Sequence, residues 1–141
     1  MTVTLSDEAR QYLVAFEDVT GAAARDCVVD EEYERVIVLV ATGDMGQAIG
    51  PGGQNVQRAE ERIGKDVKLV EDADTAEDFV ANALAPAAVY NVTISENDDT
   101  VAYAEVADED TGVAIGSDGK NIDAARALAE RHFDVDDVQL T

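Results

Sequence analysis

The sequence predicts an α+β protein built from two similar small domains. An eight-residue pattern occurs twice, as IGPGGQNV at residues 49–56 and as IGSDGKNI at residues 115–122. Gly46 and Gly112 keep the same offset, and a similar series of predicted elements surrounds each copy. With 141 residues, the chain is long enough for one ordinary domain or two very small ones, and 46% hydrophobic side chains are enough to build a core. The repeat favours two. We therefore expect one domain in residues 1–72 and a second in residues 73–141.

Each repeat begins with a predicted helix. Ser6 is placed to cap the first helix, in which apolar residues recur at helical spacing, at Ala9, Tyr12, Leu13 and Phe16. Thr75 is placed in the same way before the second helix, which Pro86 closes. Its apolar residues are Ala76, Phe79, Val80, Ala83 and Leu84.

Two β-rich runs follow each of these helices and predict a hairpin. In the first half an acidic turn joins residues 25–29 to 35–41, and in the second half residues 96–99 join 89–94 to 101–106. A short helix, the glycine loop, a longer helix and a last strand complete each repeat. The longer helices are expected at 53–63 and 119–132, and the last strands at 67–70 and 138–140. Each half is thus α-β-β-α-α-β with a three-stranded sheet, and the boundary falls in the acidic stretch 71–74.

The charge of the chain is strongly negative, with 31 acidic and 10 basic side chains and a net charge of −21. Such a balance argues against a nucleic-acid partner, because phosphate binding usually comes with a basic surface. The acidic residues, however, are spread through every segment, and only three of the basic residues are lysine. This composition resembles that of haloarchaeal proteins, whose surface carboxylates repel one another little in molar salt, where the Debye length is about 3 Å. An acidic protein that binds basic partners is the alternative.

Metal, disulfide and membrane chemistry have little support in the sequence. Cys27 is the only cysteine and lies in a predicted strand, so we expect a buried small hydrophobic side chain. His132 is the only histidine, which leaves no ligand set for a metal. The N-terminus lacks a signal pattern, and no apolar run approaches the roughly 20 residues of a membrane span. We expect a soluble cytoplasmic protein without a cofactor.

The glycine loops have the properties of phosphate-binding loops. Glycine lacks a Cβ atom, so such a backbone adopts unusual dihedral angles and allows a sugar-phosphate chain to approach closely. Each loop also leads into a predicted helix, whose first amides and positive dipole end favour an anion. Neither loop matches GxxxxGK[ST], and neither follows a strand in a dinucleotide-binding crossover. No nucleophile with a base can be assembled, so we expect no enzyme activity.

The element order, with Ile-Gly-x-x-Gly between its second and third helices, resembles the type II KH domain, a module that binds RNA and single strands. Two such domains in tandem resemble the archaeal NusA-like family across essentially the whole chain. The resemblance implies a role in transcription elongation or termination, with single-stranded RNA and RNA polymerase as partners and no small-molecule substrate. In the KH mode the loop clamps the backbone of about four nucleotides.

The candidate RNA-binding residues lie in and after the two loops. They are Ile49, Gly50, Pro51, Gly52, Gly53, Gln54, Arg58 and Arg62 in the first half, and Gly116, Ser117, Asp118, Gly119 and Lys120 in the second. Seven of the ten basic residues follow a loop: Arg58, Arg62, Lys65, Lys68, Lys120, Arg126 and Arg131. The alternative role for these arginines is pairing with nearby carboxylates, at Glu60, Glu61 and Asp66. The apolar residues that flank the loops could line a groove or belong to the core, and the core is favoured for Ile49, Val56, Ile115 and Ile122.

Two residues depart from a simple phosphate-binding loop. Pro51 removes a backbone donor from the first loop, and Asp118 places a carboxylate in the second, where Lys120 offsets it. The second half is then either an RNA-binding domain or a packing and protein-contact domain. The corresponding alternative for the whole protein is a KH-fold scaffold that contacts RNA polymerase or the ribosome and has little RNA affinity.

Overall fold

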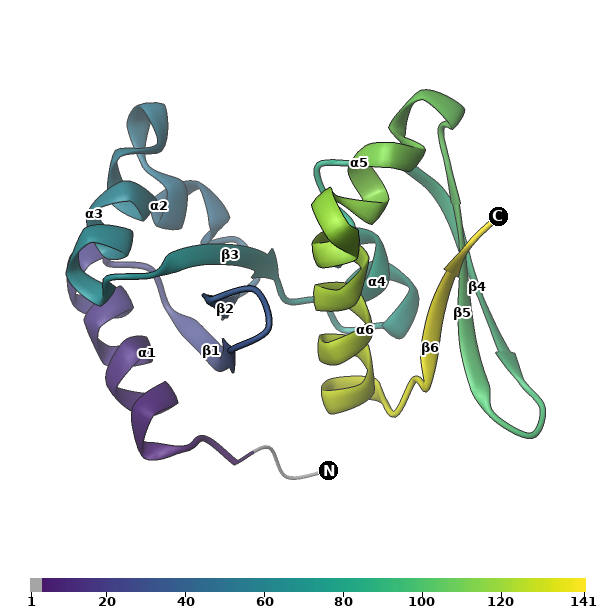
Figure 1. The fold of residues 1–141 in the computed structure, drawn as a ribbon, viewed down its shortest axis with the longest axis horizontal. Coiled ribbons are helices and arrows are strands. Elements are labelled where there is room, and N and C mark those ends of the chain that lie inside the picture. The colour runs from purple at the N-terminus through teal and green to yellow at the C-terminus, as the bar shows by residue number, and fades with distance from the viewer. Residues whose placement is uncertain (1–3) are drawn as a thin grey trace. The chain divides into compact units, whose positions relative to one another are not determined.

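The computed structural model describes residues 4–141, which form two compact units, Thr4–Asp72 and Ala73–Thr141 (Figure 1). Each unit contains a helix, two strands, two helices and a strand in that order. Short 3₁₀ turns at 51–53 and 117–119 join the last two helices of each unit. The predicted α+β fold and element order are therefore confirmed.

In the first unit three strands form one mixed sheet in the order β1-β2-β3. Strands β1 and β2 pair antiparallel, while β2 and β3 pair parallel. A parallel pair needs a crossover connection, and the two helices between β2 and β3 supply it. The elements are α1 (Asp7–Thr20), β1 (Ala24–Asp30), β2 (Arg35–Val40), α2 (Met45–Ile49), α3 (Gln54–Ile63) and β3 (Asp66–Glu71).

The second unit repeats this topology, with its sheet in the order β4-β5-β6. Strands β4 and β5 are antiparallel and β5 and β6 are parallel. The elements are α4 (Ala76–Ala83), β4 (Val89–Glu96), β5 (Thr100–Val106), α5 (Thr111–Ile115), α6 (Lys120–Phe133) and β6 (Asp137–Leu140).

Side-chain caps fix the start of the first helix in each unit, as expected. The Ser6 hydroxyl accepts a hydrogen bond from the backbone N–H of Ala9 at 3.1 Å, and Thr75 accepts one from Asp78 at 3.2 Å. Each cap satisfies one of the helix donors that otherwise lack a partner, which typically stabilises a helix by about 1 kcal/mol.

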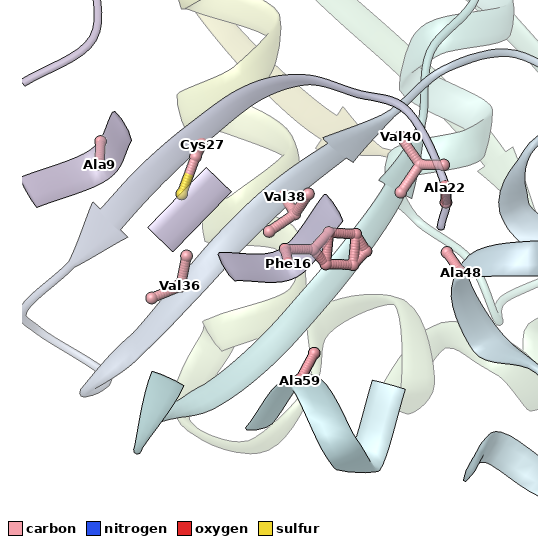
Figure 2. Close-up of a cluster of buried hydrophobic side chains, with 9 residues drawn as sticks. All are labelled: Ala9, Phe16, Ala22, Cys27, Val36, Val38, Val40, Ala48 and Ala59. Carbon is pink, nitrogen blue, oxygen red and sulfur yellow. The ribbon is translucent and has the colours of Figure 1, made fainter. Parts of the chain in front are cut away.

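The core of the first unit lies between its helices and one face of its sheet (Figure 2). Val36, Val38 and Val40 alternate along β2 and share a buried cluster with Phe16 of α1. Cys27, 1% exposed, belongs to the same cluster, so its expected role as a buried small hydrophobic side chain is confirmed. Full burial of one valine or phenylalanine side chain contributes roughly 1.5–3 kcal/mol.

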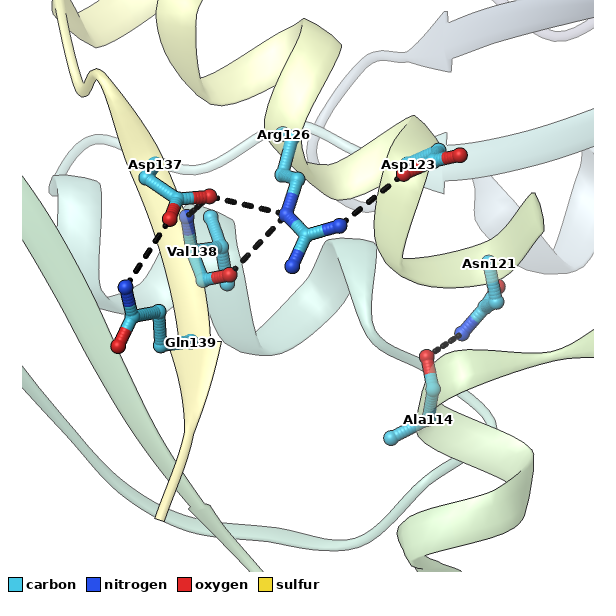
Figure 3. A network of polar contacts seen from close by, with 7 residues as sticks. All are labelled: Ala114, Asn121, Asp123, Arg126, Asp137, Val138 and Gln139. Atoms are coloured by element: carbon cyan, nitrogen blue, oxygen red, sulfur yellow. Dashed lines mark hydrogen bonds and ion pairs between the residues drawn. The ribbon is translucent and has the colours of Figure 1, made fainter. Parts of the chain in front are cut away.

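In the second unit a polar network fastens α6 to β6 (Figure 3). The Arg126 Nε donates to Asp137 Oδ1 at 2.9 Å and to the carbonyl oxygen of Val138 at 3.2 Å, and Nη1 donates to Asp123 Oδ1 at 3.1 Å. Burial raises the pKa of Asp137, but hydrogen bonds from Gln139 and Val138 and the charge of Arg126 outweigh it. The pKa of Asp137 is therefore lowered.

Candidate nucleic-acid interface

The first glycine of each loop turns the chain closely against the helix that follows. Gly50 has φ 73° and ψ 171°, and Gly116 has φ 79° and ψ 169°, a region that is essentially restricted to glycine. A Cβ atom on Gly50 would lie 2.6 Å from Cγ of Asn55, and one on Gly116 would lie 2.8 Å from Cβ and backbone N of Asn121. No other residue type fits these two positions without movement of the chain.

Two asparagines hold these turns, and the candidate residues from the sequence did not include them. The Asn55 amide nitrogen donates to the carbonyl oxygen of Gln47 at 2.9 Å, and the Gln47 amide donates to that of Thr20 at 2.8 Å. The Asn121 amide nitrogen reaches the carbonyl oxygens of Leu84 and Ala114 directly, at 3.1 and 3.2 Å. Both loops are thus tied to the end of the first helix of their unit. The signal in the sequence was the same residue at the same place of both repeats.

The third loop position has the same left-handed backbone in both units. Gly52 has φ 63° and ψ 19°, and Asp118 has φ 58° and ψ 18°. A Cβ atom on Gly52 would meet no atom within 4 Å, so this side of the loop is open. The loops therefore differ in side chain and charge while their backbones match.

Few backbone donors of the first loop are available to a ligand. Pro51 has none, and the N–H groups of Gly53 and Gln54 donate within the turn, to the carbonyl oxygens of Gly50 and Pro51. Gly52 is the loop residue whose amide has no partner in this turn. It directly precedes Gly53, the N-cap of α3, so it is near the helix end whose dipole favours an anion.

Arg58 and Arg62 lie exposed on α3, four residues apart. Neither forms an ion pair with any residue in the range 4–141, so the alternative that they pair with Glu60, Glu61 and Asp66 is wrong. Arg62 lies toward α1, where it lines a groove with Arg10 and Val14. The structure therefore leaves two cations on the helix that starts at the first loop.

The basic residues after the second loop are placed differently. Lys120 is exposed at the first position of α6, next to the loop. Arg126 is held by Asp123 and Asp137, so its expected place among the cations available to phosphate is not supported. The second loop is left with the carboxylate of Asp118, the hydroxyl of Ser117 and the ammonium of Lys120, all exposed.

The apolar residues that flank the loops divide between surface and core. Ile49 and Ile115, the last residues of α2 and α5, are 40% and 39% exposed, so the expectation of a core role is wrong for both. Their helices are only five residues long and end directly at the glycine turn. Ile122 is 5% exposed and belongs to the core as expected. Each loop thus begins beside one exposed isoleucine.

The described part of the chain has neither a metal-binding cluster nor a membrane-spanning helix. Residues 4–141 contain no group of three or more His, Cys, Asp or Glu side chains that could hold a metal ion. Within the same range, no helix combines the length and the apolar character needed to cross a membrane.

Family models match both units. A KH domain model matches residues 10–76, and a model of the NusA-like second KH domain matches residues 76–140. A solved structure, the crystal structure of APE1850, is similar with a TM-score of 0.85 and 33% identity, over 97% of this chain and 100% of that one. The tandem arrangement of KH domains is therefore shown by sequence and by fold.

Curated relatives carry the name probable transcription termination protein NusA. The protein of Halobacterium salinarum strain R1 is 63% identical over the full length of both chains. That of Halococcus morrhuae is 65% identical over 99% of both, and that of Methanocaldococcus jannaschii is 32% identical over 98% of this chain and 75% of its own length. The acidic composition agrees with that of a halophile. By these matches the chain belongs to the archaeal NusA-like family, with two tandem KH domains.

Proposed function

We propose that this protein is a non-catalytic transcription elongation and termination factor that grips single-stranded RNA through its glycine loops. The observation that carries the proposal is the repeated loop backbone, open at its third position and followed in the first unit by two unpaired arginines. RNA polymerase is the proposed protein partner and the cytoplasm the proposed location; the relatives' name, probable transcription termination protein, supports a role in transcription. The proposed role needs neither a cofactor nor a small-molecule substrate.

The first loop is the stronger RNA site in this proposal. Gly52 presents an amide and no side chain, and the exposed side chains of Gln54 and Arg58 continue along α3. In molar salt the release of counterions loses most of its driving force. Affinity then depends on backbone hydrogen bonds, base contacts and apolar contacts such as those that the exposed Ile49 provides.

Asp118 favours a second function for the second unit. Its carboxylate lies at the position that Gly52 occupies in the first loop, where it repels a phosphate. A unit of this kind serves as a scaffold that contacts RNA polymerase or the ribosome. If both units do so, the protein has little RNA affinity of its own.

Fluorescence anisotropy with a randomised short single-stranded RNA in about 2 M KCl distinguishes these functions. We expect the wild type to bind, the Gly52→Asp/Gly53→Asp variant to lose binding, and Gly119→Asp to have a smaller effect. The matched control is Gly43→Asp/Gly64→Asp, which adds the same charge at two left-handed glycines with open space around them. No binding by the wild type at any concentration would contradict the RNA-gripping function and favour the scaffold function instead.

A further inference from the structure

A groove between α1 and α3 lies at the end of α3 that is far from the first loop. It has a volume of about 470 Å³ and is lined by Asp7, Arg10, Gln11, Val14, Ala15 and Arg62. Arg62 follows Gly53 by nine residues, which corresponds to about 13 Å along a helix. The groove and the loop are thus at opposite ends of one helix.

Two guanidinium groups line this groove, and few carboxylates neutralise their positive charge. Arg62 has no ion-pair partner within residues 4–141. Arg10 has Asp7 at 3.9 Å, and the two side chains are 63% and 98% exposed, so the pair is weak. In a chain with 31 acidic side chains, two cations in one groove with one loosely held carboxylate favour an anionic ligand.

The floor of the groove suits a flat, partly apolar group. Val14 is 50% exposed, although the larger apolar side chains elsewhere on α1 pack into the core. Ala15 beside it adds no bulk, and the exposed Gln11 amide can both donate and accept hydrogen bonds. A nucleobase has these needs, since its face packs on an apolar surface while its edge forms hydrogen bonds and its phosphate pairs with arginine.

We propose that this groove is a second RNA contact site, which takes the part of a single strand that continues past the first loop. The proposal rests on the function proposed above. Arg58 connects the two sites, because it lies between Gln54 and Arg62 at intervals of four residues on one exposed helix face. An acidic peptide could also pair with Arg10 and Arg62. A peptide bound in the groove, however, would not explain why Arg58, which lies between the groove and the loop, has no ion-pair partner within residues 4–141.

Length dependence of binding tests the groove. Anisotropy is measured with randomised RNAs of four and ten nucleotides, on the wild type and on Val14→Glu, which places a carboxylate on the groove floor at an already exposed helix position. Ala127→Glu adds the same charge at an exposed position of α6 in the second unit. The ten-nucleotide RNA gains some affinity from its greater number of registers on the loop, and the Val14→Glu variant measures that baseline.

For each protein, the length preference is the affinity for the ten-nucleotide RNA divided by the affinity for the four-nucleotide RNA. We expect this ratio to be roughly tenfold larger for the wild type and Ala127→Glu than for Val14→Glu, which corresponds to one stacked base. Binding of the four-nucleotide RNA is expected to be equal in all three. A second readout is the salt dependence. Arg62→Gln is expected to reduce the slope of log K against log salt by about 0.7 for the longer RNA, and not for the shorter, because one phosphate contact is lost.

An equal length preference in the wild type and in Val14→Glu overturns the proposal. If a polyglutamate peptide binds the wild type but not Val14→Glu while the length preferences are equal, the groove is a peptide site. Failure of the loop function gives a different result. In that case Gly52→Asp/Gly53→Asp leaves binding of the four-nucleotide RNA unchanged, while the comparison with Val14→Glu still decides on the groove.

Discussion

The anchoring of the second loop by Asn121 gives a prediction whose size follows from the structure. The side chain is 9% exposed, and its amide nitrogen donates to the carbonyl oxygen of Ala114 (Figure 3). It also donates to the carbonyl oxygen of Leu84, which belongs to a different part of the unit. Asn121→Ala removes the donor and leaves buried acceptors without this partner. A buried polar group left unsatisfied costs about 1–3 kcal/mol.

The expected loss lies near the middle of that range. The carbonyl oxygen of Leu84 still accepts from the backbone N–H of Ala87 at 3.1 Å, and alanine is the better helix former. We therefore expect Asn121→Ala to lower the free energy of unfolding by about 2 kcal/mol, or Tm by about 8–16 °C for a domain of this size. Asn55→Ala is the matched control. That asparagine is less buried and donates to a single carbonyl oxygen, so we expect a loss of about 0.5–1 kcal/mol.

Urea denaturation followed by circular dichroism in molar KCl measures both losses. Hydrogen exchange of the amides in α5 and α6 assigns the Asn121→Ala effect to the second unit. If Asn121→Ala differs from the wild type by less than 0.5 kcal/mol, or if Asn55→Ala costs as much, the anchoring role inferred from the geometry is refuted.

Three further predictions concern pH and salt. Because the pKa of Asp137 is lowered from its ordinary value of 3.8, its stabilising effect is present above that value and is lost as the pH falls through the lowered pKa. Asp137→Asn is therefore expected to be less stable than the wild type at pH 7 and to approach the wild type in acid, as measured by urea titrations. Burial and then the charge of Arg35 lower the pKa of Lys68 from 10.5 to about 8. Between about pH 8 and 10.5 the lysine is therefore protonated in the unfolded chain and neutral in the folded protein, so stability rises with pH. We expect the stability of the wild type relative to Lys68→Met to increase from about pH 8 to about pH 10, and a constant difference would contradict this. Because carboxylates dominate the surface, we expect Tm to rise between about 0.1 and 3 M KCl, and a melting curve insensitive to salt would show that repulsion is unimportant.

The fold was predictable because its signals are local and occur twice. Ser6 and Thr75 begin helices through contacts only three residues away, and the continuous apolar run from Val36 to Val40 marks a buried strand directly in the chain. The duplicated glycine pattern then aligned the two halves and fixed the order of elements. The bounds of the helices after the loops differ from those expected by a single residue at each end or less.

The site was predictable only in part, because several roles depend on residues far apart in the sequence. Arg126 forms an ion pair with Asp137 only because β6 lies beside α6 in the folded unit. Arg62 lines the same groove as Arg10 only because α3 packs on α1. The short helix α2 was predicted, but the exposure of Ile49 at its end depends on how that helix packs on the unit, which the apolar pattern does not reveal. The loop residues themselves depend on backbone geometry that glycine dictates, and these could be named from the sequence.

Exchange of the third loop residues tests the central claim most directly, since the two backbones match at this position. The measurement is the affinity for a short single-stranded RNA in about 2 M KCl, for Gly52→Asp, Asp118→Gly and the control Gly64→Asp, which has the same left-handed backbone at the end of α3. If the loops grip phosphate, Gly52→Asp weakens binding roughly 5- to 30-fold, as expected for 1–2 kcal/mol, Asp118→Gly strengthens it, and Gly64→Asp leaves it unchanged. Equal affinities for all three variants and the wild type would contradict RNA binding through these loops.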